Sequence, residues 1–496
     1  MKSKTIVLLA FYNTKQIGIR FLESNLKRAG FDVLVVYCKR FNSRLPEVIT
    51  EEELSLLKEF VVCKDPLFVG ISAMTSLHLE TLEKASRAIK ECGKLLIWGG
   101  VFSTLAPEKA FESGADYVIV GEGEKAIVEF SEALSSGGDV KKINNVAYVE
   151  DGKIIKNPLN PLLEDPDGYG DCDILSKDRY LLDKNELIKC DPGSKSIGYE
   201  ISASRGCPFY CSYCSSVCLR RLYANNGKFV RFRSVDSVIR ELSLAKKQIK
   251  GLRHIHFWDE IFSDEEGWID EFVKRYKREI NLPFEIWGHP LKIDKATLEK
   301  LVSAGLYEIV VGIQSGSPSI RKDVFHRYET NEEIINASRI IKEAGVPWVT
   351  YDFMLRHEFE TDLTLKETYE LCMKLYGPFE LQLHGLSYLP KTDIVKLALE
   401  RGIYTREEMD GLLYAPMHQN FSDYWSKKTR DPNEEFYYFL IYLSQFKKYR
   451  EKTKVYSSDP EKHLKDAKAD FEKARKKERL RYYMKKGRLL LKSYIK

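Results

Sequence analysis

Short apolar runs alternate with amphipathic stretches over the first 135 residues. The runs are Ile6–Phe11, Asp32–Tyr37, Leu67–Ser72, Leu95–Trp98 and Tyr117–Val120. The stretches with helical spacing between them include Ile19–Ala29, Leu79–Lys90 and Lys125–Leu134. Unbroken apolar strands that alternate with helices are typical of a parallel sheet covered on both faces. The pattern therefore predicts an α/β domain over residues 1–140, with a flavodoxin-like doubly wound parallel sheet.

A second series of the same kind occupies residues 196–390. Its apolar runs are Ile197–Ala203, His254–Trp258, Phe284–Trp287, Glu308–Ile313, Trp348–Leu355 and Glu380–Leu386. Helical stretches separate these runs, so we expect a partial (β/α)6 barrel with its chemistry at the carboxyl ends of the strands. Residues 141–195 are rich in turn residues and are predicted to be a connector. Residues 391–496 lose the alternation and predict a mostly α-helical C-terminal region.

Composition agrees with a folded chain of several domains. The 496 residues are 44% hydrophobic and 12% aromatic, which supplies more than one core. No apolar stretch approaches the ~20 residues of a membrane-spanning helix, and Ile6–Phe11 is too short for a signal peptide. Ten cysteines in a chain of this length do not suit a disulfide scaffold. We therefore predict a cytoplasmic protein.

The charge is concentrated at the C-terminus. Residues 447–496 hold 19 basic and 7 acidic residues, a net +12, so the rest of a chain with net +5 carries −7. Because the body is acidic, no nucleic-acid partner is expected. The tail has two interpretations: a solvated helical face, or a surface with weak peripheral attraction to anionic lipid or an acidic partner.

Three cysteines follow the first strand of the predicted barrel. Cys207, Cys211 and Cys214 lie within eight residues, so their thiolates can reach three corners of one iron–sulfur cube. A [4Fe–4S] cluster normally takes four cysteines, so three leave one iron open to a small chelating ligand. Zinc is the alternative, but no further pair of ligands at zinc spacing follows.

Glycine-rich turns follow three strands of the predicted first domain, at Gly70–Thr75, Gly99–Thr104 and Gly121–Glu124. Ligands of doubly wound sheets bind outside the carboxyl ends of the strands, where glycine lets the backbone come close. Tight turns alone also favour glycine, so a ligand site and a purely structural function both remain open.

The cysteine pattern C-x-x-x-C-x-x-C after the first barrel strand resembles the signature of the radical S-adenosylmethionine (SAM) superfamily. The segment Gly206–Cys214, with Pro208 and Tyr213, matches closely. His254–Phe262 resembles that family's F-x-D-D-x-F segment, and Val311–Ser317 resembles its G-[IV]-E-S-G segment. The first domain, with its three glycine turns, resembles the cobalamin-binding domain of one large class of these enzymes.

The resemblance implies three cofactors: a [4Fe–4S] cluster on Cys207, Cys211 and Cys214, SAM chelating the open iron, and cobalamin. SAM would bind beside Tyr213 (adenine), Asp259 and Glu260 (ammonium), Gln314 and Ser315 (ribose or carboxylate) and Arg327 (carboxylate). The alternative interpretation of Arg327 is a solvated charge on a helix. Cobalamin would bind at Asn13, Gly18, Ser72, Thr75, Gly99, Gly100, Ser103, Gly121, Glu122 and Gly123. The resemblance assigns no catalytic residue.

Two loops depart from the family pattern. The loop Phe11–Gly18 lacks the D-x-H-x-x-G histidine, so cobalamin would bind without a histidine ligand, and an empty domain is the alternative. Arg356–Thr361 replaces the usual G-x-P-G-E-T. Arg356 or His357 there would contact an anionic substrate group, or would belong to a rebuilt loop with outward charges. Cys218 would be a hydrogen donor or a spare thiol.

The class of enzyme implies methylation of an unactivated carbon, or of phosphorus, in a small molecule. It would use a 5′-deoxyadenosyl radical and an electron donor such as flavodoxin or ferredoxin. The alternative within the class is a non-methylating radical reaction such as cyclisation, rearrangement or dehydration. A cluster protein that never cleaves SAM is the alternative from another class.

Overall fold

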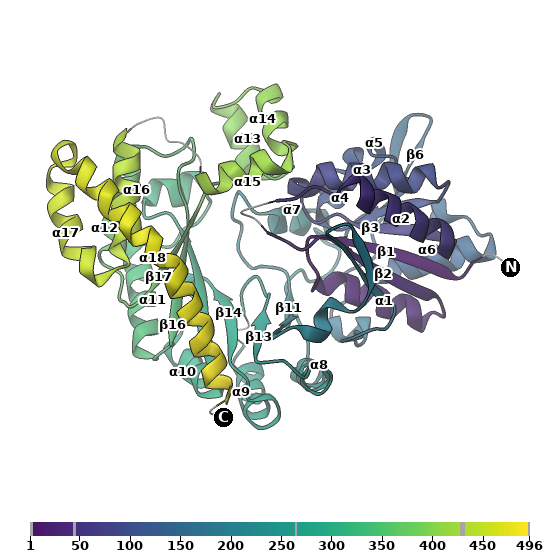
Figure 1. Cartoon of the computed structure of the whole chain (residues 1–496), viewed down its shortest axis with the longest axis horizontal. Coiled ribbons are helices and arrows are strands. Elements are labelled where there is room, and N and C mark those ends of the chain that lie inside the picture. The colour runs from purple at the N-terminus through teal and green to yellow at the C-terminus, as the bar shows by residue number, and fades with distance from the viewer. Residues whose placement is uncertain (1–2, 43–45, 263–264, 427–431, 495–496) are drawn as a thin grey trace.

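The computed structural model describes residues 3–42, 46–262, 265–426 and 432–494. Two α/β bodies lie side by side, and helices from the C-terminal region pack on both (Figure 1). The predicted fold class, an α/β sheet domain followed by a partial barrel and a helical region, is confirmed.

The first body is a nine-stranded sheet whose centre follows the flavodoxin order β5-β4-β3-β1-β2. All four of these strand pairs are parallel. In the pair β1–β2, for example, the register places Thr5 opposite Asp32. The strands are β1 (Thr5–Phe11), β2 (Asp32–Cys38), β3 (Phe68–Ser72), β4 (Leu96–Gly99) and β5 (Tyr117–Ile119). Helices on the faces include α1 (Ile17–Arg28), α2 (Glu51–Lys64), α3 (Leu79–Glu91), α5 (Pro107–Glu112) and α6 (Glu124–Ser136). The apolar runs form the predicted strands because both faces are covered.

The segment predicted as a connector extends this sheet at both edges. β6 (Val146–Glu150) and β7 (Lys153–Lys156) join β5 as an antiparallel hairpin. β8 (Arg179–Asp183) pairs in parallel with β2, and β9 (Glu186–Lys189) returns beside it. The outermost strands β7 and β9 are charged and largely exposed, as edge strands often are. Their weak apolar signal is why the sequence did not predict them.

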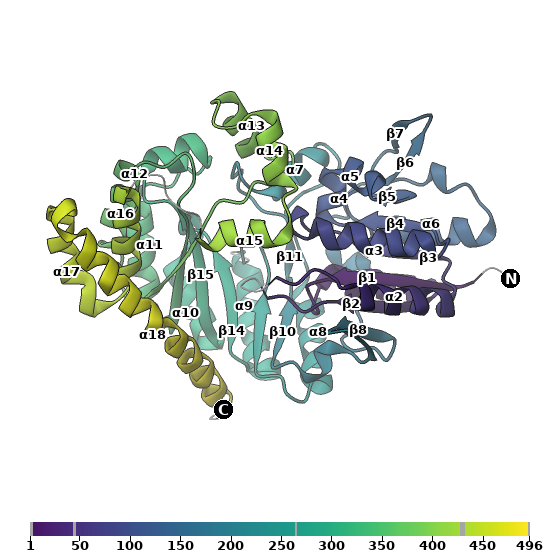
Figure 2. The ribbon, with the colours of Figure 1, turned by 45° about the horizontal axis from the view of Figure 1, so that its top comes forward.

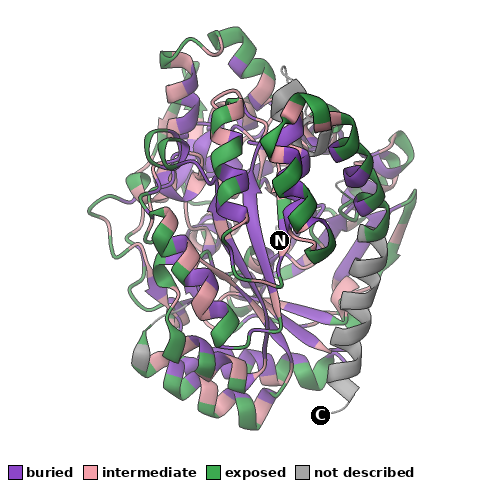
Figure 3. Ribbon diagram, turned by 90° about the vertical axis from the view of Figure 1, so that its left-hand side faces the viewer, coloured by how far each residue is buried: buried purple, intermediate pink, exposed green. Residues whose placement is uncertain are grey.

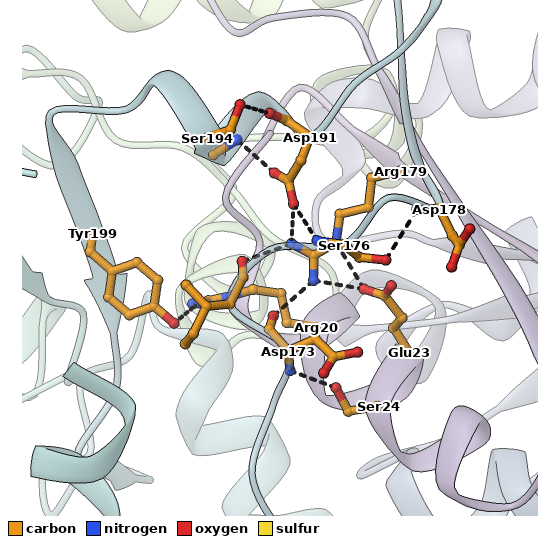
Figure 4. Close-up of polar contacts among 12 residues, drawn as sticks. Arg20, Glu23, Ser24, Asp173, Ser176, Asp178, Arg179, Asp191, Ser194 and Tyr199 are labelled. Atoms are coloured by element: carbon orange, nitrogen blue, oxygen red, sulfur yellow. Dashed lines mark hydrogen bonds and ion pairs between the residues drawn. The ribbon is translucent and has the colours of Figure 1, made fainter. Parts of the chain in front are cut away.

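A buried polar network fastens both this segment and the first barrel strand to α1 (Figure 4). Arg179 donates to Glu23 of α1 at 2.7 and 2.9 Å and to Asp191 at 2.8 Å. Arg20 of α1 reaches the hydroxyl of Tyr199 and the carbonyl of residue 200. The buried charge of Arg179 is tolerated because the carboxylates of Glu23 and Asp191 lie beside it and carry the opposite charge. The first domain, the connector and the first barrel strand are therefore held together.

The second body is a six-stranded parallel sheet in sequential order, curved as part of a barrel (Figure 2). Its strands are β10 (Gly198–Ile201), β13 (His254–Phe257), β14 (Phe284–Gly288), β15 (Leu306–Gln314), β16 (Trp348–Met354) and β17 (Glu380–His384). The covering helices are α8 (Val235–Gln248), α9 (Glu266–Arg275), α10 (Lys295–Ala304), α11 (Asn331–Glu343) and α12 (Asp362–Cys372). All six predicted strands and the five helical stretches between them are confirmed.

Alternate residues of the barrel strands face opposite sides, as strand geometry requires. Ile255, Phe257, Ile309 and Val311 lie in the core under the helices. In Figure 3 these strands are buried behind helices whose outer faces are exposed. The residues between them, such as His256, therefore face the inside of the barrel, where the chemistry of such folds is found.

The C-terminal region is helical and packs on both bodies. It comprises α13 (Asp393–Glu400), α14 (Arg406–Leu413), α15 (Met417–Ser426), α16 (Pro432–Ser444), α17 (Lys447–Ser458) and α18 (Pro460–Tyr494). The aromatic segment of α16 joins the barrel core through Phe436 and Phe439. Phe421 of α15 instead joins the first domain, 5.6 Å from the ring of Phe41. The side chains of residues 478–494 lie outside those described, so both interpretations of the basic tail stay predictions.

Along the described residues, none of the helices combines the length and the apolar character that crossing a membrane requires.

Candidate functional site

A cavity of about 570 Å³ opens between the two bodies. One wall is made by the glycine turns at the carboxyl ends of β1, β3, β4 and β5. The other is made by the carboxyl ends of β10 and β13 and the start of the cysteine loop, including Ser202, Gly206, Trp258 and Glu260. The ligand edges of a doubly wound sheet and of a barrel therefore face one shared space.

Most of the residues predicted for cobalamin line this cavity. They are Asn13, Gly18, Ser72, Gly99, Gly100, Gly121, Glu122 and Gly123. Two do not. Thr75 accepts a hydrogen bond from the amide of Leu77 at 3.3 Å, and the buried Ser103 donates to the carbonyl of Gly100 at 3.3 Å. The side chains of Thr75 and Ser103 therefore stabilise local turns, whereas the other eight predicted residues lie together around the cavity.

The glycines of these turns have different functions. Gly100 has φ +100°, and a Cβ there would stand 2.6 Å from the carbonyl oxygen of Ala73, so the turn itself requires glycine. Gly18 lines the cavity, and apart from its own helix no described residue comes within 4 Å of the position a Cβ would take. A side chain at Gly18 would occupy the cavity, so the open surface there fits a large ligand that approaches the backbone.

The cysteine loop runs from β11 (Ser204–Arg205) to α7 (Ser215–Leu222). Ser212 anchors the middle of this loop. Its backbone amide donates to the carbonyl of Phe325 at 3.0 Å, and its hydroxyl donates to the carbonyl of Val324 at 2.5 Å. Burial raises the pKa of the Cys207 thiol to about 11 and that of Cys214 to about 12. Three soft thiols on one anchored loop fit an iron–sulfur cluster.

Within the described ranges, no three His, Cys, Asp or Glu side chains converge on one metal-ion position. The ligands of a [4Fe–4S] cube do not converge in this way, because each cysteine binds a different iron.

The two acidic residues predicted for the SAM ammonium have different surroundings. Asp259 is 2% exposed, and its carboxylate accepts from the amide of Ala203 at 3.1 Å and from the hydroxyl of Ser204. Burial raises the pKa of Asp259 to about 6. Glu260 lines the cavity, and desolvation raises its pKa. Asp259 therefore holds the end of β10 in place, and Glu260 is the carboxylate within reach of a ligand.

Gln314, the last residue of β15, carries a buried side-chain acceptor. The side-chain amide of Gln314 donates to Asp352 at 3.3 Å, while its buried Oε1 has no hydrogen-bond partner among the described residues. The amide orientation is fixed by chemistry, since Oε1 cannot face a carboxylate. Gln314 also has φ +70°, a strained region that clusters at ligand sites. A buried unsatisfied acceptor fits the hydroxyls or ammonium of SAM.

Arg327 is 5% exposed, so the alternative of a solvated charge is wrong. Its guanidinium lies 3.9 Å from Cys211 Sγ and 3.5 Å from the hydroxyl of Tyr213, and it pairs with Glu329 at 2.6 Å. Tyr213 packs edge-on against Phe325, with ring centroids 5.2 Å apart. The guanidinium is thus held by Glu329 and by the carbonyl of Gly312, and its contact with the carboxylate of SAM stays a prediction.

Ser315, also predicted for SAM, is fully buried, and its hydroxyl accepts from the amide of Ser317 at 3.2 Å. This hydroxyl therefore faces the protein.

An acid–imidazole pair inside the barrel was missed by the sequence analysis. His384, at the end of β17, lies 2.8 Å from Asp352 Oδ1, whose other oxygen accepts from Gln314. Burial works to lower the pKa of His384, but the bond and charge of Asp352 outweigh it and raise the pKa. The alternation of Glu380, Gln382 and His384 along β17 is the sequence signal that predicts an inward face.

An ionic clamp joins the cobalamin-type turn to the cysteine loop. Glu122 pairs with Arg231 at 2.5 Å and with Arg205 at 3.3 Å, and accepts from the hydroxyl of Tyr169. Burial works to raise the pKa of Glu122, but the two arginines outweigh it and hold the pKa below its usual range. The amide of Glu122 donates to the hydroxyl of Tyr223 at 2.8 Å. The carboxylate of Glu122 therefore binds protein, although we predicted it for cobalamin.

The loop that departs from the family pattern turns inward. Arg356 stacks on Tyr438 of α16, 3.6 Å from the ring centroid, and His357 is 4% exposed. Neither residue lines the cavity. The alternative of outward charges is wrong, and the substrate contact stays a prediction without support here. The thiol of Cys218 lies 3.2 Å from the carbonyl of Lys391, away from the cavity lining.

Comparison with known families agrees with both halves of the site. The profile of the B12 binding domain matches residues 3–131, and that of the radical SAM superfamily matches residues 201–372. These ranges contain the glycine turns and the cysteine loop. The predicted resemblance is confirmed.

Similar proteins include two curated relatives and a solved structure. A protein of Pyrococcus horikoshii described as an uncharacterised methyltransferase is 28% identical over 72% of this chain and 73% of its own length. The anaerobic magnesium-protoporphyrin IX monomethyl ester cyclase of Rubrivivax gelatinosus is 26% identical over 71% of this chain, which spans 61% of that enzyme. The fold is similar to the radical SAM methyltransferase TsrM of Kitasatospora setae with cobalamin and a [4Fe–4S] cluster bound (TM-score 0.62, 19% identity, 80% of this chain and 78% of that chain).

Proposed function

This chain is a radical SAM enzyme with a B12-binding domain, and from that premise we propose that it methylates an unactivated carbon, or phosphorus, of a small-molecule substrate. Its cofactors are a [4Fe–4S] cluster, SAM and cobalamin bound without a histidine ligand. The observation that carries the proposal is the shared cavity, because the B12-type turns and the cysteine loop face the same space.

When bound, the cluster with SAM supplies a carbon-centred radical, and cobalamin supplies a methyl group. The chain orients these groups. Cys207, Cys211 and Cys214 hold the cluster at the mouth of the barrel. Glu260 and Arg327 neutralise the ammonium and carboxylate of SAM, and Gln314 accepts from its ribose. The glycine turns leave room for cobalamin on the opposite wall.

The clamp of Glu122, Arg205 and Arg231 joins the two bodies beside the cavity, with the side chain of Arg231 2% exposed. We place the enzyme in the cytoplasm and expect an electron donor of the flavodoxin or ferredoxin type.

A second candidate function is a radical reaction without methyl transfer. One curated relative is a cyclase, so similarity alone does not choose between the two chemistries. Cyclisation uses the same radical, and cobalamin would then not be remethylated.

The test is anaerobic reconstitution with iron, sulfide and hydroxocobalamin, followed by metal analysis and incubation with a low-potential reductant and SAM that carries a deuterated methyl group. Methylation predicts about four irons and one cobalt per chain. It also predicts 5′-deoxyadenosine and cobalamin labelled with the deuterated methyl. Deoxyadenosine with unlabelled cobalamin would favour the cyclase-type reaction. A protein that binds iron but forms no deoxyadenosine would contradict both.

A further inference from the structure

The inner face of the barrel is acidic. Its six strands, which lie wholly within the described ranges, contain no Lys or Arg. Their carboxylates are Glu200, Glu285, Glu308, Asp352 and Glu380. After each of them, the next residue along the strand belongs to the core under the helices. Because alternate residues of a strand face opposite sides, all five carboxylates face the inside of the barrel.

Three inward side chains form a row on the side of the barrel that faces the first domain. The strand register pairs Glu200 of β10 with His256 of β13, and His256 with Glu285 of β14. Nδ1 of His256 contacts Oε1 of Glu285. In Figure 1, β13 and β14 lie on the part of the barrel nearest the first domain. We call Glu200, His256 and Glu285 the inner row, and each of its side chains is 17–25% exposed, so a ligand can reach them.

The shared cavity has an excess of negative charge beside the inner row. Two guanidinium groups and four carboxylates line it, which gives 2 − 4 = −2. These groups belong to Arg205, Arg231, Glu122, Glu124, Glu200 and Glu260. The two arginines pair with Glu122 and Glu124 in the clamp. Two carboxylates are left, and since Glu260 is our choice for the ammonium of SAM, Glu200 has no ligand assigned to it.

The protein offsets the charge of Glu200 only in part. Nζ of Lys15 lies 3.8 Å from Glu200 Oε1, and Lys15 itself does not line the cavity. Burial raises the pKa of Glu200, and the charges of Lys15, His256 and Arg20 act to lower it but do not outweigh the burial. A buried carboxylate is stabilised by a positive partner. A cationic ligand in the cavity would supply that partner.

Two tryptophans form an aromatic wall next to the inner row. Trp258 lines the cavity and is 46% exposed, and its ring centroid lies 5.9 Å from that of Trp287. Strand alternation places Trp258 on the same face as His256, and Trp287 on the same face as Glu285. A tryptophan ring attracts a cation to its face more strongly than other aromatic rings do. An exposed indole beside carboxylates therefore fits an organic cation.

The barrel interior also holds an acceptor that no described residue satisfies. Gln314 is 8% exposed, and its amide donates to the inward carboxylate of Asp352, so its side chain lies on the inner face. Its Oε1 has no partner among the described residues. A buried acceptor of this kind indicates a ligand that brings donors. This observation is independent of the carboxylates, and it marks the same interior as the side where ligands bind.

We propose that the substrate is a protonated amine, and that its ammonium group binds to Glu200 and Glu285 of the inner row beside the ring of Trp258. The inference rests on the proposed function, because it names the class of molecule that the enzyme would act on. A substrate whose only charged group is a phosphate or a carboxylate would meet groups of its own sign there, and like charges repel. Among the substrates of the proposed reaction, amines are therefore favoured over phosphorus-containing anions.

The test measures the binding of two probes of similar shape and opposite charge, 2-phenylethylamine and 3-phenylpropionate, by equilibrium dialysis. The protein is the reconstituted holoenzyme with saturating SAM and without reductant, so SAM fills its own site and is not cleaved. The variant E200Q/E285Q removes both charges of the inner row. The matched control E299Q/E332Q removes two exposed carboxylates from the outer helices α10 and α11. A further variant, Trp258→Leu, removes the ring but keeps an apolar side chain.

We expect the wild type and E299Q/E332Q to bind the amine at least about tenfold more tightly than the propionate, because hydrogen bonds to charged groups contribute a factor of about ten or more. E200Q/E285Q should bind the amine at least about tenfold more weakly than the control does. Trp258→Leu should weaken binding of the amine by about two- to fivefold through loss of the cation–π contact, and should leave binding of the propionate unchanged.

Equal affinities of the wild type for the two probes, or no binding of the amine, would overturn the proposal. The same preference for the amine in E200Q/E285Q as in the control would also overturn it. If E200Q/E285Q does not fold, unchanged binding of the amine to Trp258→Leu overturns it instead. These readouts need no turnover, so a preference for the amine stands even if no methyl is transferred. Conversely, labelled cobalamin without that preference would contradict this inference and leave the proposed methylation intact.

Discussion

The clamp at Glu122 predicts that one isosteric substitution loosens the contact between the two bodies. Glu122→Gln keeps the shape of the side chain but removes the charge that faces Arg231 and Arg205. Breaking a buried ion pair by removing one partner costs about 3–5 kcal/mol. The side chains of Glu122 and Arg205 are 22% and 26% exposed and Arg205 keeps Glu124 at 2.5 Å, so we expect the lower end, about 3 kcal/mol.

Native-state amide exchange measures this opening directly. The amide of Glu122 is itself bonded to Tyr223 across the interface, so its protection reports the clamp. At about 1.4 kcal/mol per factor of ten, protection around residues 120–124 and 204–206 should fall about a hundredfold or more. The control is Glu129→Gln on the same domain, whose pair with Lys125 at 3.6 Å is largely solvated. A surface pair of this kind contributes at most about 1 kcal/mol.

The pH dependence gives the same clamp a second test. The pKa of Glu122 is lowered in the folded protein, so its stabilising effect is complete above the ordinary carboxyl pKa. It is lost as pH falls through the lowered value. Wild-type protection at the interface should therefore decrease in acid more than that of Glu122→Gln. If Glu122→Gln and Glu129→Gln show equal protection at neutral pH, the clamp reasoning is refuted.

Three other substitutions test the site. Glu260→Gln should weaken SAM binding by at least about tenfold in equilibrium titration, through loss of a charge-assisted bond, while Asp259→Asn changes it little; the reverse order would contradict our assignment. Burial raises the pKa of Asp259 to about 6. The free energy of unfolding of the wild type should therefore fall by about 3 kcal/mol as pH rises from the ordinary carboxyl pKa to above 6. Urea unfolding of Asp259→Asn should show no such fall. Arg356→Ala should lower the free energy of unfolding by about 2 kcal/mol, because it removes the stack on Tyr438; a raised substrate KM at unchanged stability would restore the substrate interpretation.

Local pattern was sufficient to predict the five central strands of the first body and the six strands of the barrel, but not the strands β6 to β9 of the connector. The apolar run of β1 and its neighbours and the six runs of the barrel became strands as expected, because burial on both faces requires continuous apolar sequence. The spacing of Cys207, Cys211 and Cys214 predicted the cluster loop, since ligands on one short loop are a local property. Charged edge strands such as β7 and β9 carry no such signal and were missed.

The functions of individual side chains depended on contacts between distant segments. Asp259 and Glu260 are adjacent in sequence, yet one is bound by the backbone at Ala203 and the other faces the cavity. Strand alternation continued from His256 through Trp258 points to Glu260, so this choice was partly within reach of the sequence. The pairing of Asp352 with His384 required the register of β16 and β17.

By itself, the sequence determined the two folds, their order along the chain and the cysteine loop, because hydrophobic periodicity and ligand spacing act over a few residues. Only the tertiary structure decided that Glu122 clamps the domains, that Arg356 stacks on α16, and that the two ligand edges share one cavity. These features come from charges and rings more than 80 residues apart in the chain. Their contact depends on how the two bodies pack, which no local pattern encodes.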